Sequence, residues 1–305
     1  MFALGFVLLL SGGCGGGYAQ KRSTPAAPLE VPFEFVANQI IVQVRIAGKG
    51  PYSMLFDTDT DPSAIDLGVA REIGLQLDAR SFPASGGGTE ANLVRLTRLP
   101  TVELGAVMAK DVAAGAIDLK KLSAKLGRPA QGVLGYSFLK DRIVQIDYPA
   151  SKIRFYNDNP YPGIQNSANT VNKIAMPFRY DGGVVIDSVF INGQKVKATL
   201  DTGSGETFAL TPEGAAIVGL DDEAQDGPAE KSVGYNGEFE SKSGVLKSVR
   251  IGRLSLESAP AVFWPPKSGH DKKNYQVNIG NGFFKDYLMT FDFRGKMVVF
   301  EQGDD

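Results

Sequence analysis

The feature that most constrains this chain is a long internal repeat. Residues 56–60 read Phe-Asp-Thr-Asp-Thr, and residues 200–204, at an offset of 144 positions, read Leu-Asp-Thr-Gly-Ser. Further along, residues 135–141 (Gly-Tyr-Ser-Phe-Leu-Lys-Asp) resemble residues 280–286 (Gly-Asn-Gly-Phe-Phe-Lys-Asp) at an offset of 145 positions. Similar landmarks in the same order and at nearly the same spacing predict two homologous halves that fold alike.

Each half begins with a predicted β-hairpin that ends at an aspartate, Asp57 in the first half and Asp201 in the second. Apolar residues alternate along both strands of each hairpin, which is the pattern of half-buried β-strands. The alternating positions are Ile40, Val42, Val44, Ile46, Tyr52, Met54 and Phe56 in the first half, and Val189, Ile191, Val196, Ala198 and Leu200 in the second. Both aspartates are therefore predicted at the end of a buried strand.

The repeat divides the chain into two lobes, at residues 29–164 and 165–305, which follow a leader segment at residues 1–28. The polar residues 165–170 fit a linker between the lobes. The 36 glycines and 17 prolines favour a turn-rich, mostly β fold. Only short helices are predicted, within residues 67–75, along Leu119, Leu122 and Leu126, and after an N-cap at Thr211 that precedes Pro212.

Composition removes several classes of chemistry. The chain has one histidine, His270, and one cysteine, Cys14, so it cannot build a multi-ligand zinc site or an internal disulfide. Its 32 basic and 34 acidic residues are nearly balanced, so a nucleic-acid-binding surface is not indicated. Catalysis, if present, should depend on carboxylates, hydroxyls and the backbone, with no metal and no organic cofactor.

The first residues resemble an export signal. Residues 2–10 are nearly all apolar but too few to span a bilayer. Two processing routes fit: residues 10–14 resemble a bacterial lipobox that would lipidate Cys14, and residues 17–19 resemble a signal peptidase site. Either route predicts an exported protein, periplasmic or anchored in the bacterial envelope through a lipid. The alternative is an unprocessed apolar N-terminus on a cytosolic protein.

The paired Asp-Thr elements indicate acid–base chemistry. A carboxylate at a strand end accepts hydrogen bonds from the amides of the turn that follows. If a pseudo-twofold axis brings Asp57 and Asp201 within a few ångströms, the two carboxyls share a proton, because both cannot ionise easily. One can then deprotonate a water while the other donates a proton to a carbonyl oxygen.

These residues carry a resemblance to the aspartic proteases, and more closely to the bacterial retropepsin-like proteins with two copies fused in one chain. Residues 200–204 match the hydrophobic-hydrophobic-Asp-Thr-Gly-Ser element. The second landmark of that family, two hydrophobic residues and a glycine, matches at residues 133–135 and less fully at residues 278–280. The resemblance covers nearly all of residues 31–301. It implies a monomer of two pepsin-type β-barrel lobes that binds a peptide or protein substrate between them.

The resemblance also implies roles for individual residues. Asp57 and Asp201 would hold the nucleophilic water, and the hydroxyls of Thr58 and Thr202 would bond across to the opposite lobe. Three further residues would support the carboxylates: the amide of Gly203, and the side chains of Thr60 and Ser204 at the outer carboxylate oxygens.

Flaps over the cleft are expected between each aspartate loop and its downstream glycine. The candidate in the first lobe is the segment of Gly86, Gly87 and Gly88. The candidate in the second lobe is a hairpin with Tyr235 and an Asn236-Gly237 turn.

Asp59 departs from the family pattern, which has glycine at that place. Its side chain adds a third carboxylate beside the predicted pair, which would raise the cost of ionising either partner and could fill the water position. Two hypotheses stay open: an active aspartic endopeptidase, and a catalytically impaired relative that binds peptides or another ligand without cleavage. A calcium loop opening at Asp57 is disfavoured, because Pro62 and Gly68 stand where such a loop needs glycine and glutamate.

Overall fold

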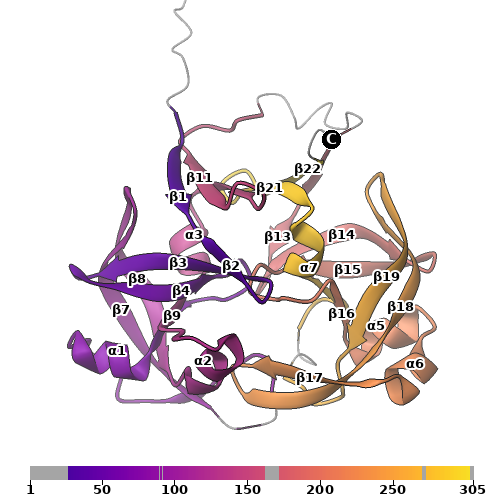
Figure 1. The fold of residues 1–305 in the computed structure, drawn as a ribbon, viewed down its shortest axis with the longest axis horizontal. Helices are drawn as coiled ribbons and strands as arrows, with labels where there is room; N and C mark the ends of the chain where they lie inside the picture. Colours follow the sequence, from indigo (N-terminus) through magenta and orange to yellow (C-terminus); the bar gives the residue numbers. More distant parts are fainter. Residues whose placement is uncertain (1–26, 89, 91, 162–171, 270–272, 303–305) are drawn as a thin grey trace, which may run out of the picture.

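The computed structural model describes residues 27–88, 90, 92–161, 172–269 and 273–302. Two β-rich lobes stand side by side, the first in indigo to magenta and the second in orange to yellow (Figure 1). Within the described residues, no helix is both long and apolar enough to cross a membrane. The predictions for Cys14, the 165–170 linker and His270 concern residues outside the described ranges.

The first lobe is a closed barrel. Its strands run in the order β2-β3-β4-β9-β5-β8-β7-β6, and an additional β3–β7 pairing closes the ring. They are β2 (Glu34–Val36), β3 (Gln39–Ile46), β4 (Lys49–Phe56), β5 (Ser63–Asp66), β6 (Phe82–Pro83), β7 (Leu93–Leu104), β8 (Val107–Ile117) and β9 (Gly132–Leu134). Barrel closure removes free strand edges and gives the lobe an interior that side chains fill.

The second lobe repeats this barrel strand for strand. Its order is β13-β14-β15-β20-β16-β19-β18-β17, and a β14–β18 pairing closes it. The strands are β13 (Arg179–Tyr180), β14 (Val184–Ile191), β15 (Gln194–Leu200), β16 (Phe208–Leu210), β17 (Ala229–Gly234), β18 (Gly237–Ile251), β19 (Leu254–Phe263) and β20 (Val277–Ile279). The mostly β, two-lobed fold predicted from the repeat is confirmed.

The two predicted hairpins are β3–β4 and β14–β15. Their alternating apolar residues fill the barrel interiors because successive strand residues face opposite sides of a sheet. On β3 the residues Ile40, Val42, Val44 and Ile46 are all fully buried.

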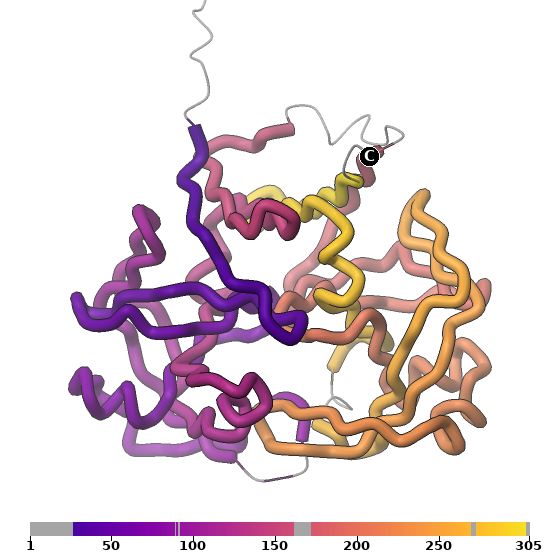
Figure 2. The backbone as a smooth tube through the Cα atoms, in the orientation of Figure 1, coloured from indigo at the N-terminus to yellow at the C-terminus, as the bar shows by residue number. Residues whose placement is uncertain are grey.

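A six-stranded sheet joins the lobes, and the repeat did not predict it. Its order is β1-β11-β10-β21-β22-β12, so the strands nearest both chain ends belong to it (Figure 2). The strands are β1 (Leu29–Pro32), β10 (Ile143–Asp147), β11 (Lys152–Tyr156), β12 (Lys173–Pro177), β21 (Tyr287–Asp292) and β22 (Met297–Gln302). In its central antiparallel pair, Gln145 faces Thr290, its own repeat equivalent. The pseudo-twofold axis therefore passes between these two residues.

The helices are short and cap the barrels. Those expected from sequence are α1 (Leu67–Glu72), α2 (Lys120–Leu126) and α5 (Pro212–Ile217). The hydroxyl of Thr211 caps α5 by accepting a hydrogen bond from the amide of Gly214 at 3.1 Å. Within the described ranges, three others were not expected: α3 (Tyr136–Leu139), α6 (Asp221–Asp226) and α7 (Asn281–Phe284). The four residues of α3 and of α7 are too few to show a helical period, and α6 buries no residue that would mark an apolar face.

Candidate active site

The two aspartates lie at the ends of equivalent strands, Asp57 after β4 and Asp201 after β15. The amide of Asp57 donates to the carbonyl of Leu134 at 3.1 Å, and the amide of Asp201 donates to the carbonyl of Ile279 at 2.9 Å. Each acceptor belongs to the hydrophobic-hydrophobic-Gly landmark of its own lobe. The landmark strands β9 and β20 therefore run beside the aspartate loops and hold their backbones.

Thr58 and Thr202 lock the two loops together across the pseudo-twofold axis. The hydroxyl of Thr58 donates to the carbonyl of Leu200 at 2.7 Å, and the hydroxyl of Thr202 donates to the carbonyl of Phe56 at 2.9 Å. Each hydroxyl also accepts the amide of the other threonine at 3.1 Å. Both threonines are fully buried, so these reciprocal bonds are shielded from water.

This lock brings the two aspartates into one cluster. A Cβ atom placed on Gly203 would lie 2.2 Å from Oδ2 of Asp57, so the second loop must carry glycine at that position. The carboxylate of the first loop thus packs directly on the second loop.

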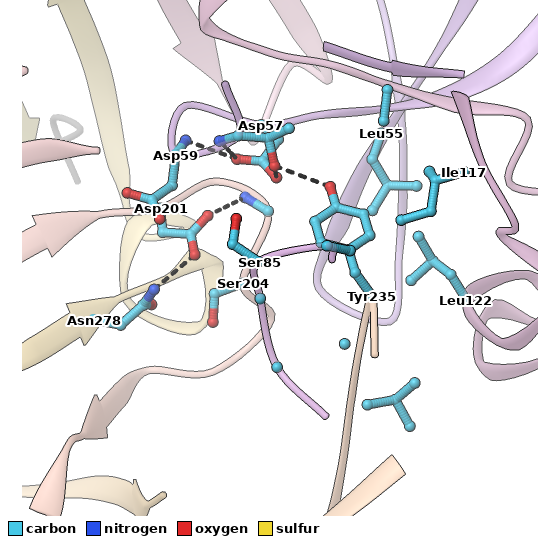
Figure 3. A pocket seen from close by; sticks show the side chains of 18 of the residues that line it. Leu55, Asp57, Asp59, Ser85, Ile117, Leu122, Asp201, Ser204, Tyr235 and Asn278 are labelled. Atoms are coloured by element: carbon cyan, nitrogen blue, oxygen red, sulfur yellow. Dashed lines mark hydrogen bonds between the residues drawn. The ribbon is translucent and has the colours of Figure 1, made fainter. Parts of the chain in front are cut away.

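Asp57 is held by its own loop. Its Oδ1 accepts the amides of Asp59 at 2.7 Å and Thr60 at 2.9 Å, and its Oδ2 accepts the Thr60 hydroxyl at 2.6 Å. Asp59 therefore supplies through its backbone the amide that glycine supplies in the other loop. The Thr60 hydroxyl lies 2.9 Å from the phenol oxygen of Tyr235, which reaches in from the second lobe (Figure 3).

Asp201 has a different environment. Its Oδ1 accepts the amide of Gly203 at 2.8 Å, as expected, but its Oδ2 accepts the side-chain amide of Asn278 at 2.6 Å (Figure 3). The expectation for Ser204 at the outer oxygen differs from the structure. The Ser204 hydroxyl instead accepts the amide of Glu206 at 3.3 Å, and the side chain of Asn278 supplies the donor to Oδ2 of Asp201.

Asn278 was missed in the sequence, although a signal was present. It stands in the second landmark, where Val133 stands in the first lobe. Its neighbour across the parallel pairing is Thr199, where the first lobe has Leu55. Two polar residues thus replace two apolar ones at facing buried positions. Because buried polar groups need hydrogen-bond partners, such a paired change predicts polar contacts at this place.

The charges in the cluster shift proton affinities. Burial raises the pKa of Asp201 well above its usual range, and the negative charges of Asp57 and Asp59 raise it further. Hydrogen bonds from Asn278 and Gly203 oppose this rise only in part. These effects favour the protonated form of Asp201.

Asp59 itself is directed toward the second lobe. Its Oδ1 accepts the hydroxyl of Thr199 at 2.7 Å, and its Oδ2 lies 3.7 Å from the ammonium of Lys273. Burial raises the pKa of Asp59 to about 6, against the lowering effects of Lys273 and Thr199. Both carboxylate oxygens of Asp59 therefore face partners in the second lobe.

The two predicted flaps meet over the cleft. The hairpin of β17 and β18 pairs Gly234 with Gly237, so its turn is centred on Tyr235-Asn236, one residue before the expected Asn-Gly centre. Gly237 has a φ of 89°, as in a hairpin whose turn ends in a left-handed glycine. The first-lobe segment, which carries Gly88, is the loop between β6 and β7.

Asn236 connects the two flap tips. Its backbone amide donates to the carbonyl of Gly87 at 2.8 Å, and its carbonyl accepts the amide of Glu90 at 2.8 Å. Its side-chain amide donates to the carbonyls of Ala84 at 3.0 Å and Gly86 at 3.1 Å. The structure is therefore the flap-closed form.

Beneath the flaps lies a cavity of about 360 Å³. Asp57, Asp59 and Asp201 line it together with apolar side chains from both lobes, including Leu55, Ile117, Leu122, Phe239 and Trp264. Apolar walls with a few convergent polar groups are typical of ligand sites.

The comparisons with known proteins agree with this geometry. A search of curated protein sequences found no match. Among solved structures, the crystal structure of basic 7S globulin from soybean is similar over 92% of this chain and 96% of that chain, with a TM-score of 0.50 and 14% sequence identity, a likeness of fold. A family model described as aspartyl protease matches residues 42–138 and 188–283, once in each lobe. These two matches cover more than half of the sequence, so the chain belongs to the aspartyl protease family.

Proposed function

We propose that this protein is an aspartic endopeptidase that hydrolyses peptide bonds with a water held between Asp57 and Asp201. The proposal rests on one observation: the reciprocal Thr58–Thr202 bonds bring together two carboxyls with unequal surroundings. Three donors stabilise negative charge on Asp57, whereas burial and repulsion keep a proton on Asp201. A pair of carboxyls with different proton affinities can act as base and acid in one step.

The reaction follows from these two states. Asp57 takes a proton from the water while the water oxygen bonds to the peptide carbonyl carbon. Asp201 gives its proton to the carbonyl oxygen. In the resulting tetrahedral diol, Asp57 returns a proton to the nitrogen as the carbon–nitrogen bond breaks. Asp201 recovers its proton from a diol hydroxyl, which leaves a carboxylic acid and an amine.

The substrate enters a cleft that the flaps cover. An extended peptide with apolar side chains near the cleaved bond suits the walls formed by Leu55, Ile117 and Trp264. Entry requires the bonds between Asn236 and the opposite flap to open. We extend the proposal to a monomer that acts outside the cytoplasm on peptides or proteins.

The alternative, binding without cleavage, depended on Asp59. Its backbone still donates to Asp57, and its carboxylate is bonded to Thr199. The peptidase is therefore the better supported of the two functions.

Incubation of the purified protein with a diverse peptide library between about pH 3 and pH 7 tests the proposal. We expect internal cleavage that falls by roughly 10²- to 10⁴-fold in Asp201→Asn. The matched control is Asp141→Asn, a carboxylate outside the site, which should cleave like wild type. Cleavage that survives in Asp201→Asn would refute the proposed mechanism.

A further inference from the structure

The second lobe contains a polar pocket that binds the side chain of Asp59. Thr199, which is fully buried, donates its hydroxyl to Oδ1 of Asp59 at 2.7 Å. A Cβ atom placed on Gly183 would lie 1.7 Å from the same oxygen, so the absence of a side chain at Gly183 leaves room for the carboxylate. Lys273, which also donates to the carbonyl of Gly182 at 3.3 Å, places its ammonium 3.7 Å from Oδ2.

The first lobe lacks an equivalent pocket. Leu55 stands where the second lobe has Thr199, and Gly203 stands where the first lobe has Asp59. A side chain on Gly203 would collide with Asp57, whereas Asp59 is accommodated by the lobe it faces. Asp59 and the second-lobe residues that bind its carboxylate have no counterpart across the pseudo-twofold axis, although the rest of the site is pseudo-symmetric.

Asp59 acts on the acid–base pair through charge. Its negative charge is among the causes that raise the pKa of Asp201. Within the part of the chain that the structure describes, the ionisable groups that interact with it are the carboxyls of Asp57 and Asp201, the ammonium of Lys273, and the phenols of Tyr180, Tyr235 and Tyr275. Burial raises the pKa of all three phenols, so they stay neutral in the working range. The charge of Asp61 also raises the pKa of Tyr180.

We propose that Asp59 is a positioning residue that holds the proton on Asp201 up to a higher pH than an Asp-Thr-Gly loop would, with Lys273 favouring the ionised form of Asp59. This deepens the proposed peptidase function and rests on it. With Asp59 ionised, removal of the last proton from the pair leaves three neighbouring negative charges instead of two. Activity should therefore extend closer to neutral pH, since it requires one proton on the pair.

Removal of the Asp59 charge should move the pH profile. Asp59→Asn, which keeps an acceptor for Thr199, should lower the midpoint of the alkaline limb of kcat/KM by about one pH unit. Lys273→Met removes the cation that favours ionised Asp59, so Asp59 should ionise at a higher pH. Lys195→Met is the matched control, because this lysine is exposed on β15 and does not line the cavity, and it should leave the limb in place. Equal profiles for wild type and Asp59→Asn would overturn the proposal.

A second measurement keeps the inference independent of turnover. Titration of ¹³C-labelled aspartate carboxyls by NMR identifies Asp201 by the signal lost in Asp201→Asn. The Asp201 midpoint should fall in Asp59→Asn, and the Asp59 midpoint should rise in Lys273→Met. An unchanged Asp201 midpoint in Asp59→Asn would overturn the inference. If the midpoints shift but no peptide is cleaved, the inference holds and the proposed function fails. If cleavage depends on Asp201 but the midpoints do not shift, the function holds and the inference fails.

Discussion

The loop of Asp57 and the loop of Asp201 differ in what surrounds each carboxylate. Among the described residues, Asp57 accepts three hydrogen bonds from its own loop, and Asp201 accepts one from its loop and one from Asn278. The backbones of the two loops are nevertheless held alike by Thr58 and Thr202. A duplicated framework thus fixes position, and a few unmatched side chains decide which carboxyl is acid and which is base.

The largest stability effect is expected at Asp59, which belongs to one loop alone. Its pKa of about 6 is raised by burial, so its stabilising contribution is complete below its unfolded pKa and is lost as pH rises through about 6. Asp59→Asn does not ionise there. The difference between its free energy of unfolding and that of wild type should therefore change in favour of the variant by about 2 to 3 kcal/mol between pH 4 and pH 7. Urea unfolding at several pH values measures this difference. A difference that does not change with pH would contradict the shift.

The shared framework can be tested from both sides. Thr58→Val and Thr202→Val each leave a buried carbonyl and a buried amide without a partner, so each should cost about 2 kcal/mol of unfolding free energy. We expect nearly equal losses because the bonds are reciprocal. Denaturant unfolding of both variants and of the double variant gives the values. A large loss in only one of them would break the symmetry assigned to this part of the site.

Asn278→Val places the first-lobe residue in the second lobe. Loss of the donor to Asp201 should raise the pKa of that carboxyl further and shift the alkaline limb of kcat/KM upward by about one pH unit. The pH profile of the variant measures the shift. A limb that stays in place would mean that Asn278 does not tune Asp201.

Ser204→Ala should have the smallest effect. The Ser204 hydroxyl contacts the amide of Glu206 and not the carboxylate of Asp201, so both stability and kcat/KM should change little, by about 0.5 kcal/mol or less. Thermal unfolding and steady-state kinetics measure both quantities. A tenfold loss of activity would restore the role that the family pattern suggested for this serine.

The sequence predicted what depends on repetition. The 144-residue offset indicated two like lobes, and alternation along residues 40–56 indicated the strands that place Asp57. The Thr58–Thr202 pairing matches what the family resemblance implied.

The remainder depends on contacts between distant segments. The pairing of β10 with β21 joins strands about one repeat apart, and neither strand carries a local sign of its partner. Lys273 and Thr199 contact Asp59 from the other lobe, which no spacing along the chain reveals. Asn278 reaches Asp201 from a strand that lies 77 residues further along the chain.

The pH dependence of kcat/KM for peptide cleavage, measured on wild type, Asp57→Asn and Asp201→Asn, tests the central claim that two homologous loops form one acid–base pair. We expect a bell-shaped profile for wild type and a loss of roughly 10²- to 10⁴-fold in each variant, since base and acid are both required. Wild-type rates in either variant, or a profile without an alkaline limb, would contradict it.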